Sequence, residues 1–181
     1  MALAYEVCVD WDMTNWTATP DFTGPFDNIS NDIMTVKWVR GEVREDGNSP
    51  ASTLELRIKG SLYAKYSIFN QYGDLYQKLL PWRVVRVRAV LNGTPYNVFF
   101  GFISKIKVNP HLGAPEVYIY CTDGLDLLAR AIINQDWQNR IIMTDGDAVD
   151  TVLNAAGWSA GRRDIDIDGG EIFQYPVVTG V

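Results

Sequence analysis

The chain has 181 residues, 47% of them hydrophobic and 21% charged, so it can bury a sizeable core and is not intrinsically disordered. Its length predicts one domain or a domain and a half. The formal net charge of −6 argues against general nucleic-acid binding, although it leaves room for a local basic patch.

Six strands are predicted in the first two thirds of the chain, over residues 5–12, 32–41, 53–58, 81–90, 97–108 and 116–122. In the second of them, Ile33, Trp38 and Val39 are core candidates. Strand alternation predicts that seven apolar residues from the other strands share one core: Leu54, Leu56, Ile58, Val85, Val87, Val117 and Ile119.

Two long loops interrupt these strands. Residues 14–31 are rich in Thr, Pro, Gly, Asp and Asn, and a loop of this length is unusual unless it binds or covers something. Residues 61–80 contain four of the nine tyrosines and form an irregular excursion, with one helical turn expected over 74–79. Residues 110–115 are expected to form a turn.

The pattern becomes helical after Asp123-Gly124. Apolar residues recur at helical spacing from Leu125 to Ile132, and a second helix is predicted over 147–156. Thr144 or Asp145 would cap this second helix and Gly157 would end it. A short strand is expected over 171–174.

The order of elements predicts an α+β fold that is mainly β, a tail-tube-like β barrel or sandwich with a short two-helix appendage. The expected divisions are a β domain over 1–123, a helical appendage over 124–158 and a turn-rich segment over 159–181, which would lead into a further domain. Leu128, Val152 and Leu153 are expected to pack the appendage on the β domain.

The two cysteines, Cys8 and Cys121, lie inside predicted strands and are expected to be buried free thiols. The sequence does not decide whether they form a disulfide, because the bond requires Cα atoms within about 7 Å. No signal peptide and no apolar run of membrane-spanning length is visible. We therefore expect a soluble protein, made in a cytoplasm, without a membrane anchor.

No residue pattern predicts an enzyme. The segment Asp164–Gly169 imitates the first half of a calcium loop, but Tyr175 stands where the bidentate Glu belongs, so a charged strand edge is favoured. The single histidine, His111, has no accompanying nucleophile motif. Four aspartates near the N-terminus lack the spacing of a carboxylate pair and are typical of turns: Asp10, Asp12, Asp21 and Asp27. Phosphate-loop and zinc spacings are absent, and no catalytic residue, metal or cofactor is expected.

One cluster of positive charge is predicted, on the two strands joined by the Asn92-Gly93 turn. Its members are Arg83, Arg86, Arg88, Lys105 and Lys107. The period of two places Arg86 and Arg88 on one face and Lys105 and Lys107 on one face. The cluster is interpreted either as a solvated face, neutralised by the acidic residues at 42, 45, 46 and 55, or as a surface that meets an acidic neighbour or lines a nucleic-acid passage.

A series of motifs resembles the N-terminal part of tail-tip or baseplate-hub (minor tail) proteins of long-tailed bacteriophages and prophages. The matching motifs are YEVCVDWD at 5–12, WVRG at 38–41, STLELR at 52–57, LLPWRVVRVRA at 79–89, FFGFI at 99–103, YCTDGL at 120–125 and GDAVDTVLNAAGW at 146–158. They cover most of the chain in order. The chain departs from this family in its shorter length and in a diverged loop near residues 70–73.

The resemblance implies a structural virion component, without enzymatic activity, that joins the tail tube to the distal tip around a central channel. It implies a homo-oligomeric ring, contacts with other tail proteins, and passage of genome DNA through the channel without specific binding. Two alternatives stay open: a tail-tube or adaptor protein, and a carbohydrate- or receptor-binding module suggested by the Tyr- and Trp-rich loops. A small tail-fused hydrolase is a third class, which the missing catalytic motif disfavours.

Overall fold

The computed structural model describes residues 3–13, 18–41, 51–110, 115–130, 143–158 and 172–173. The chain divides into two compact units, one formed by Met1–Trp16 and Pro20–Leu127 and the other by Thr17–Thr19 and Leu128–Val181. Each unit is described here by itself.

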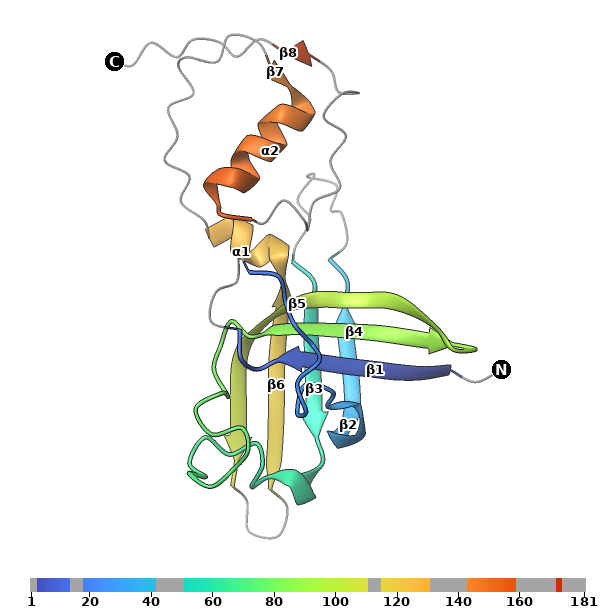
Figure 1. Cartoon of the computed structure of the whole chain (residues 1–181), viewed down its shortest axis with the longest axis vertical. Helices are drawn as coiled ribbons and strands as arrows, with labels where there is room; N and C mark the ends of the chain where they lie inside the picture. The colour runs from blue at the N-terminus through green and yellow to red at the C-terminus, as the bar shows by residue number, and fades with distance from the viewer. Residues whose placement is uncertain are drawn as a thin grey trace. The chain divides into compact units, whose positions relative to one another are not determined.

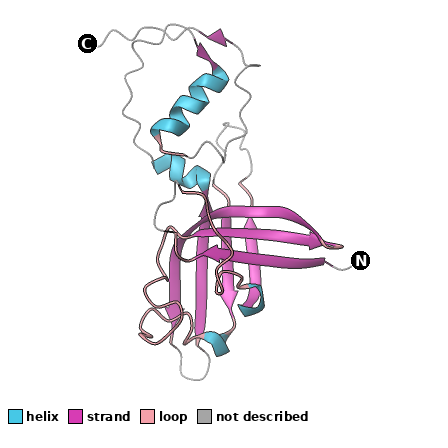
Figure 2. Cartoon of the chain, viewed as in Figure 1, coloured by secondary structure: helices cyan, strands magenta, loops and turns pink. Residues whose placement is uncertain are grey.

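The first unit is built on one antiparallel sheet of six strands (Figures 1 and 2). The strands are β1 (Leu3–Asp10), β2 (Ile33–Val39), β3 (Thr53–Ile58), β4 (Val84–Leu91), β5 (Thr94–Asn109) and β6 (Glu116–Asp123). Their order across the sheet is β1-β4-β5-β6-β3-β2, and the sheet curls into a half-barrel. Together with two short helices, this architecture confirms the predicted α+β, mainly β fold class.

The core lies on the concave face of this sheet. All seven residues that strand alternation assigned to one core are at most 2% exposed and pack in a single cluster: Leu54, Leu56, Ile58, Val85, Val87, Val117 and Ile119. The core assignment of Val39 was wrong, because Val39 pairs with Thr53 on the opposite face and is 58% exposed. Its neighbour Trp38 lies on the core face opposite Leu54 but is 37% exposed, and Ile33 packs half-buried against the core.

The two edge strands of the half-barrel approach each other. Tyr5 on β1 and Trp38 on β2 have ring centroids 6.0 Å apart. The loop before β2 runs along the free edge of β1, where Val9 N donates to Asp27 O and Ile29 N donates to Val7 O. Ile29 is fully buried in the core. The described part of the long N-terminal loop therefore covers an edge strand, which is one of the two roles expected of a loop of this length.

The predicted Asn92-Gly93 turn joins β4 to β5. Asn92 has φ 50° and Gly93 has φ 87°, the left-handed conformations that a two-residue hairpin turn needs. Farther along β5, a Cβ on Gly101 would lie 2.2 Å from Thr122 O on β6, so this close approach of the two strands requires glycine.

Residues 60–82, which we call the excursion, connect β3 to β4. The excursion begins with the 3₁₀ helix η2 (Gly60–Leu62) and continues in turns. The helical turn expected over 74–79 is not formed, because these residues follow successive hydrogen-bonded turns and Gln77 has φ 64°. Tyr66 and Leu75 are fully buried and fix the excursion to the core.

The helices are α1 (Gly124–Arg130) and α2 (Asp145–Ala155), and a second small sheet pairs β7 (Met143–Thr144) with β8 (Ile172–Phe173). Helix α2 begins two residues before its predicted start. Of the two predicted caps, Thr144 is the N-cap, in a capping box with Asp147, and Gly157 adopts φ 73° just after the helix ends, as predicted. Three side chains were expected to be the buried contacts of the helical appendage, and they are only half-buried: Leu128, Val152 and Leu153. Residues 159–171 and 174–181 lie outside the described residues.

Candidate functional site

Four of the five predicted cationic residues lie on the convex face of the sheet, opposite the core. Arg86 and Arg88 point away from the core on β4, and Lys105 and Lys107 do so on β5. However, they do not form one cluster. Arg86 lies opposite Phe100 on β5, and Lys105 follows five residues later, a separation of about 16 Å along the strand. The convex face therefore carries two separate cationic patches.

Arg83, the fifth of these cationic residues, is buried and links two loop segments. Its side chain is buried, and its guanidinium donates hydrogen bonds to the carbonyl oxygens of Met13 and Lys78. These bonds connect the end of the excursion to the segment that follows β1. In the folded chain, Arg83 thus satisfies backbone acceptors.

The first patch is centred on Glu6. The Glu6 carboxylate accepts a hydrogen bond from Arg88 Nη2, and Arg86 Nη2 lies 3.7 Å from the same oxygen. The hydrogen bond from Arg88 holds the pKa of Glu6 below its usual value. The Phe22 ring lies against the Arg86 guanidinium, with 4.2 Å between its centroid and Arg86 Cζ. Glu6 offsets one of the two positive charges of this patch, and the sequence analysis did not consider this residue as a partner.

The second patch is exposed. Lys105 lies opposite Tyr120, and Lys107 lies opposite Tyr118. The two tyrosine rings stack with centroids 6.2 Å apart. No salt bridge involves either lysine within the described part of the chain. Of the acidic residues that could have neutralised the cluster, Glu55 lies between Lys37 and Tyr120 on the sheet, and residues 42, 45 and 46 lie outside the described residues.

The two cysteines are buried and free, as predicted. Cys121 belongs to the core, whereas Cys8 lies on the convex face and donates from Sγ to Glu6 Oε1. Because they lie on opposite faces of the sheet, they form no disulfide. Burial raises the pKa of Cys8 to about 11, and it raises the pKa of Cys121 further. Neither thiol has the character of a nucleophile.

The N-terminal aspartates hold loops together. Asp10 accepts from the backbone N–H groups of Met13 and Asp21, each at 2.9 Å, and Asp27 accepts from Gly24 N at 2.8 Å. The described residues contain no group of three or more metal-ligating side chains. His111 and the Asp164–Gly169 segment lie outside the part of the chain that the structure describes. No helix within the described ranges is long and apolar enough to cross a membrane.

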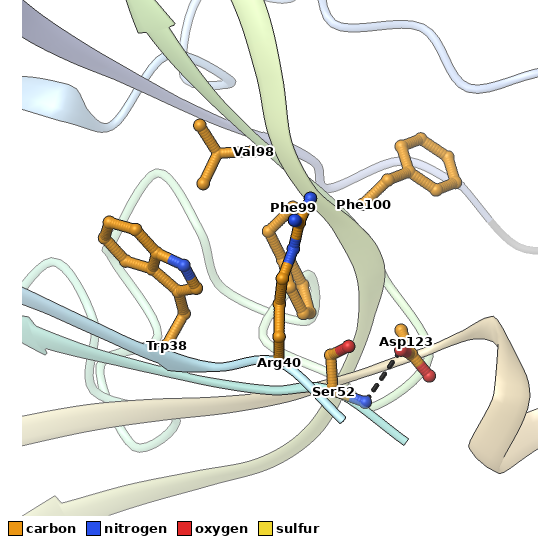
Figure 3. A pocket seen from close by; sticks show the side chains of 7 residues that line it. All are labelled: Trp38, Arg40, Ser52, Val98, Phe99, Phe100 and Asp123. Atoms are coloured by element: carbon orange, nitrogen blue, oxygen red, sulfur yellow. Dashed lines mark hydrogen bonds between the residues drawn. The ribbon is translucent and has the colours of Figure 1, made fainter. Parts of the chain in front are cut away.

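A pocket of about 180 Å³ lies at the end of the sheet where β3 begins (Figure 3). Its lining residues are Trp38, Arg40, Ser52, Val98, Phe99, Phe100 and Asp123. Figure 3 shows the Arg40 side chain between Trp38 on one side and Ser52 with Asp123 on the other.

Two hydrogen bonds fix the Asp123 side chain in this pocket. The Asp123 carboxylate accepts from Ser52 N at 2.7 Å and from Leu125 N at 3.0 Å. The sequence analysis did not find the pocket, because its residues come from four separate segments and share no motif.

The sequence matches no protein-family model and no curated protein. Among solved structures, the chain is similar to the 43 kDa tail protein of prophage MuSo2 from Shewanella oneidensis, with a TM-score of 0.55 and 12% sequence identity. The similarity covers 96% of this chain and 43% of that protein, so the chain spans less than half the length of its neighbour. The chain therefore shares its fold with part of a prophage tail protein.

Proposed function

We propose that the protein is a structural component of a phage or prophage tail. The observation that carries this proposal is the fold shared with a prophage tail protein over 96% of the chain. The motif series from residue 5 to residue 158, which resembles tail-tip and baseplate-hub proteins, supports the finer assignment to the distal tail. The chain would join the tail tube to the tip, as a homo-oligomeric ring around a central channel.

The exposed lysine patch supports a channel-facing or neighbour-facing role for part of the convex face. Lys105 and Lys107 carry no charge partner among the described residues, and the surrounding tyrosines give the patch apolar area. Such a surface suits transient contact with DNA phosphates during genome passage, or contact with an acidic neighbouring subunit. The Arg86 and Arg88 patch is less suited to this role because Glu6 already occupies it.

Electron microscopy of tails labelled with antibody against the chain tests this proposal. A tail-tip or hub component gives label at the distal end only, and a strain that lacks the gene makes tails with a defective tip. Label along the whole shaft would favour the tube alternative. Intact, infectious particles that contain none of the protein would refute a structural role in the tail.

A further inference from the structure

The excursion presents an aromatic side chain on a fixed backbone. Tyr72 is 98% exposed, whereas Tyr66 and Leu75 on either side of it are fully buried in the core. Asn70 fixes the backbone next to Tyr72, since its Oδ1 accepts from Tyr72 N at 3.2 Å and its Nδ2 donates to Ala64 O at 2.9 Å. Ordering this loop on binding would cost little entropy, which favours a binding role for the exposed ring.

The excursion has almost no free charge. Lys65 pairs with Asp32 at 2.6 Å and Lys78 pairs with Asp12 at 2.8 Å, which leaves Asp74 as its one charged residue without a salt bridge to another described residue. Its exposed apolar residues are Ile68, Phe69, Tyr72, Tyr76, Leu80 and Trp82. An aromatic surface depleted of charge is typical of the centre of a protein–protein interface, and the shortage of cations disfavours nucleic acid.

The pocket at the other end of β3 has the size of one aromatic ring. Its volume of about 180 Å³ is below the range of sites for drug-sized ligands, which begins at about 300 Å³. For comparison, an enclosed apolar cavity of about 150 Å³ binds benzene, whereas this pocket is partly open and has a polar side. The aromatic side chains of Trp38 and Phe99 in its lining suit the faces and edges of a ring.

The polar groups of the pocket suit a phenol in particular. Arg40 is exposed and has no ion pair within the described residues, so its guanidinium can lie against an aromatic face. The Asp123 carboxylate accepts one backbone N–H at each oxygen, and each oxygen can accept a further hydrogen bond. A tyrosine hydroxyl that reaches the pocket can donate to Asp123.

The excursion and the pocket adjoin opposite ends of β3. Ser52, in the pocket, immediately precedes β3, and the excursion begins at Gly60, just after β3 ends. We infer that copies of this chain associate head to tail, with Tyr72 of one copy inserted into the pocket that Trp38, Arg40 and Asp123 line in the next. Such a heterologous contact closes into a ring when the rotation between copies closes, and otherwise gives an open filament. The inference deepens the proposed homo-oligomeric ring and rests on it.

Analytical ultracentrifugation of the purified chain tests the contact. We expect concentration-dependent association of the wild type, and monomers for both Tyr72→Ser and Arg40→Glu, with unchanged melting temperatures because both side chains are exposed. Tyr96→Ser is the matched control: Tyr96 is 54% exposed on the β4–β5 hairpin, so its loss should leave association unchanged.

Mixing the two variants gives the decisive result. Tyr72→Ser keeps an intact pocket and Arg40→Glu keeps an intact Tyr72, so the mixture should form a dimer of one copy of each and grow no further.

A wild type that stays monomeric at every concentration, or a mixture that stays monomeric, would overturn the inference. If the wild type does not self-associate but binds a glycan, and Tyr72→Ser loses that binding, the Tyr72 side chain would be assigned to carbohydrate binding instead. A monomeric chain that still labels tail tips would overturn this contact alone, whereas self-association without tail label would overturn the proposed function.

Discussion

Glu6 and Arg88 lie directly opposite each other on β1 and β4, and the Glu6 carboxylate accepts a hydrogen bond from the Arg88 guanidinium. Arg86, the next residue on the same face of β4, shares this carboxylate at 3.7 Å. One acidic side chain therefore compensates two arginines that are each about one quarter exposed. The buried Nε atoms of both arginines have no hydrogen-bond partner among the described residues. Loss of the Glu6 carboxylate would therefore add to the unpaired donors that this patch already buries.

We expect Glu6→Gln to lower the free energy of unfolding by about 1–3 kcal/mol at pH 7, because it leaves two half-buried guanidinium groups without a counter-charge. Urea titration measures this change. Glu116→Gln is the control, since Glu116 pairs with the more exposed Arg57 and its loss should cost about 0–1 kcal/mol. Equal effects of the two substitutions would contradict the central position of Glu6.

The same pair predicts a pH dependence. The pKa of Glu6 is lowered from 4.5 in the folded chain, so its contribution to stability is complete above pH 4.5 and is lost as the pH falls through the folded-state pKa. The stability difference between wild type and Glu6→Gln should therefore shrink on acidification below pH 4.5. A difference that stays constant down to pH 2 would show that the carboxylate charge has no role.

Val87→Asp should abolish soluble folding. Val87 is fully buried between β1 and β5 in the core, and an unpaired buried charge costs several kcal/mol, a large fraction of the stability of a domain. Soluble yield and a thermal melt check this prediction. Lys107→Asp, on an exposed position of the neighbouring strand, should fold normally. A soluble Val87→Asp protein with a wild-type melting curve would refute the placement of Val87.

Thr144→Ala should destabilise helix α2 by about 1 kcal/mol, because it removes the side-chain oxygen that accepts from Asp147 N at 3.1 Å. Thr144→Ser keeps that acceptor and should be close to neutral. Helical circular dichroism during a denaturant titration measures both variants. Indistinguishable curves for Ala and Ser would mean that the cap contributes nothing.

The native protein should resist thiol labelling at pH 8. Cys8 has a pKa of about 11 and Cys121 a higher one, so less than about 1% of either thiol is ionised at that pH, and both are buried. Iodoacetamide should therefore label both cysteines only after denaturation, as mass spectrometry can follow. Rapid labelling of the folded chain would contradict the burial of these residues.

Charge reversal can separate a functional lysine patch from a solvated one. Lys105→Glu with Lys107→Glu should fold like wild type, because both side chains are exposed. If the patch faces the channel or an acidic neighbour, tails that carry the double variant will fail in assembly or DNA passage, and plaque yield will fall. Normal tails and normal yield would favour a solvated face. Arg86→Glu is a poorer probe, because it would place a second carboxylate beside Glu6 and destabilise the fold.

The sequence by itself determined the six strands of the main sheet, most of the core and the helix cap to within one residue. Alternation in residues 53–58 assigned three side chains to the core because successive side chains on a strand point to opposite faces. The Asn92-Gly93 turn and the Thr144 cap were predictable because each depends on local backbone geometry. A local pattern could not place Val39, whose side depends on the register of β2 against β3.

Only the tertiary structure decided which charges and rings meet. Five cationic residues that are near one another in sequence separate into a buried side chain, an arginine pair that shares the Glu6 carboxylate, and an exposed lysine pair. Glu6 is 82 residues from Arg88, and the pocket draws Trp38, Phe100 and Asp123 from separate strands. Antiparallel pairing across a curled sheet brings distant residues together, and the register that fixes those neighbours is a property of the whole sheet rather than of any one segment.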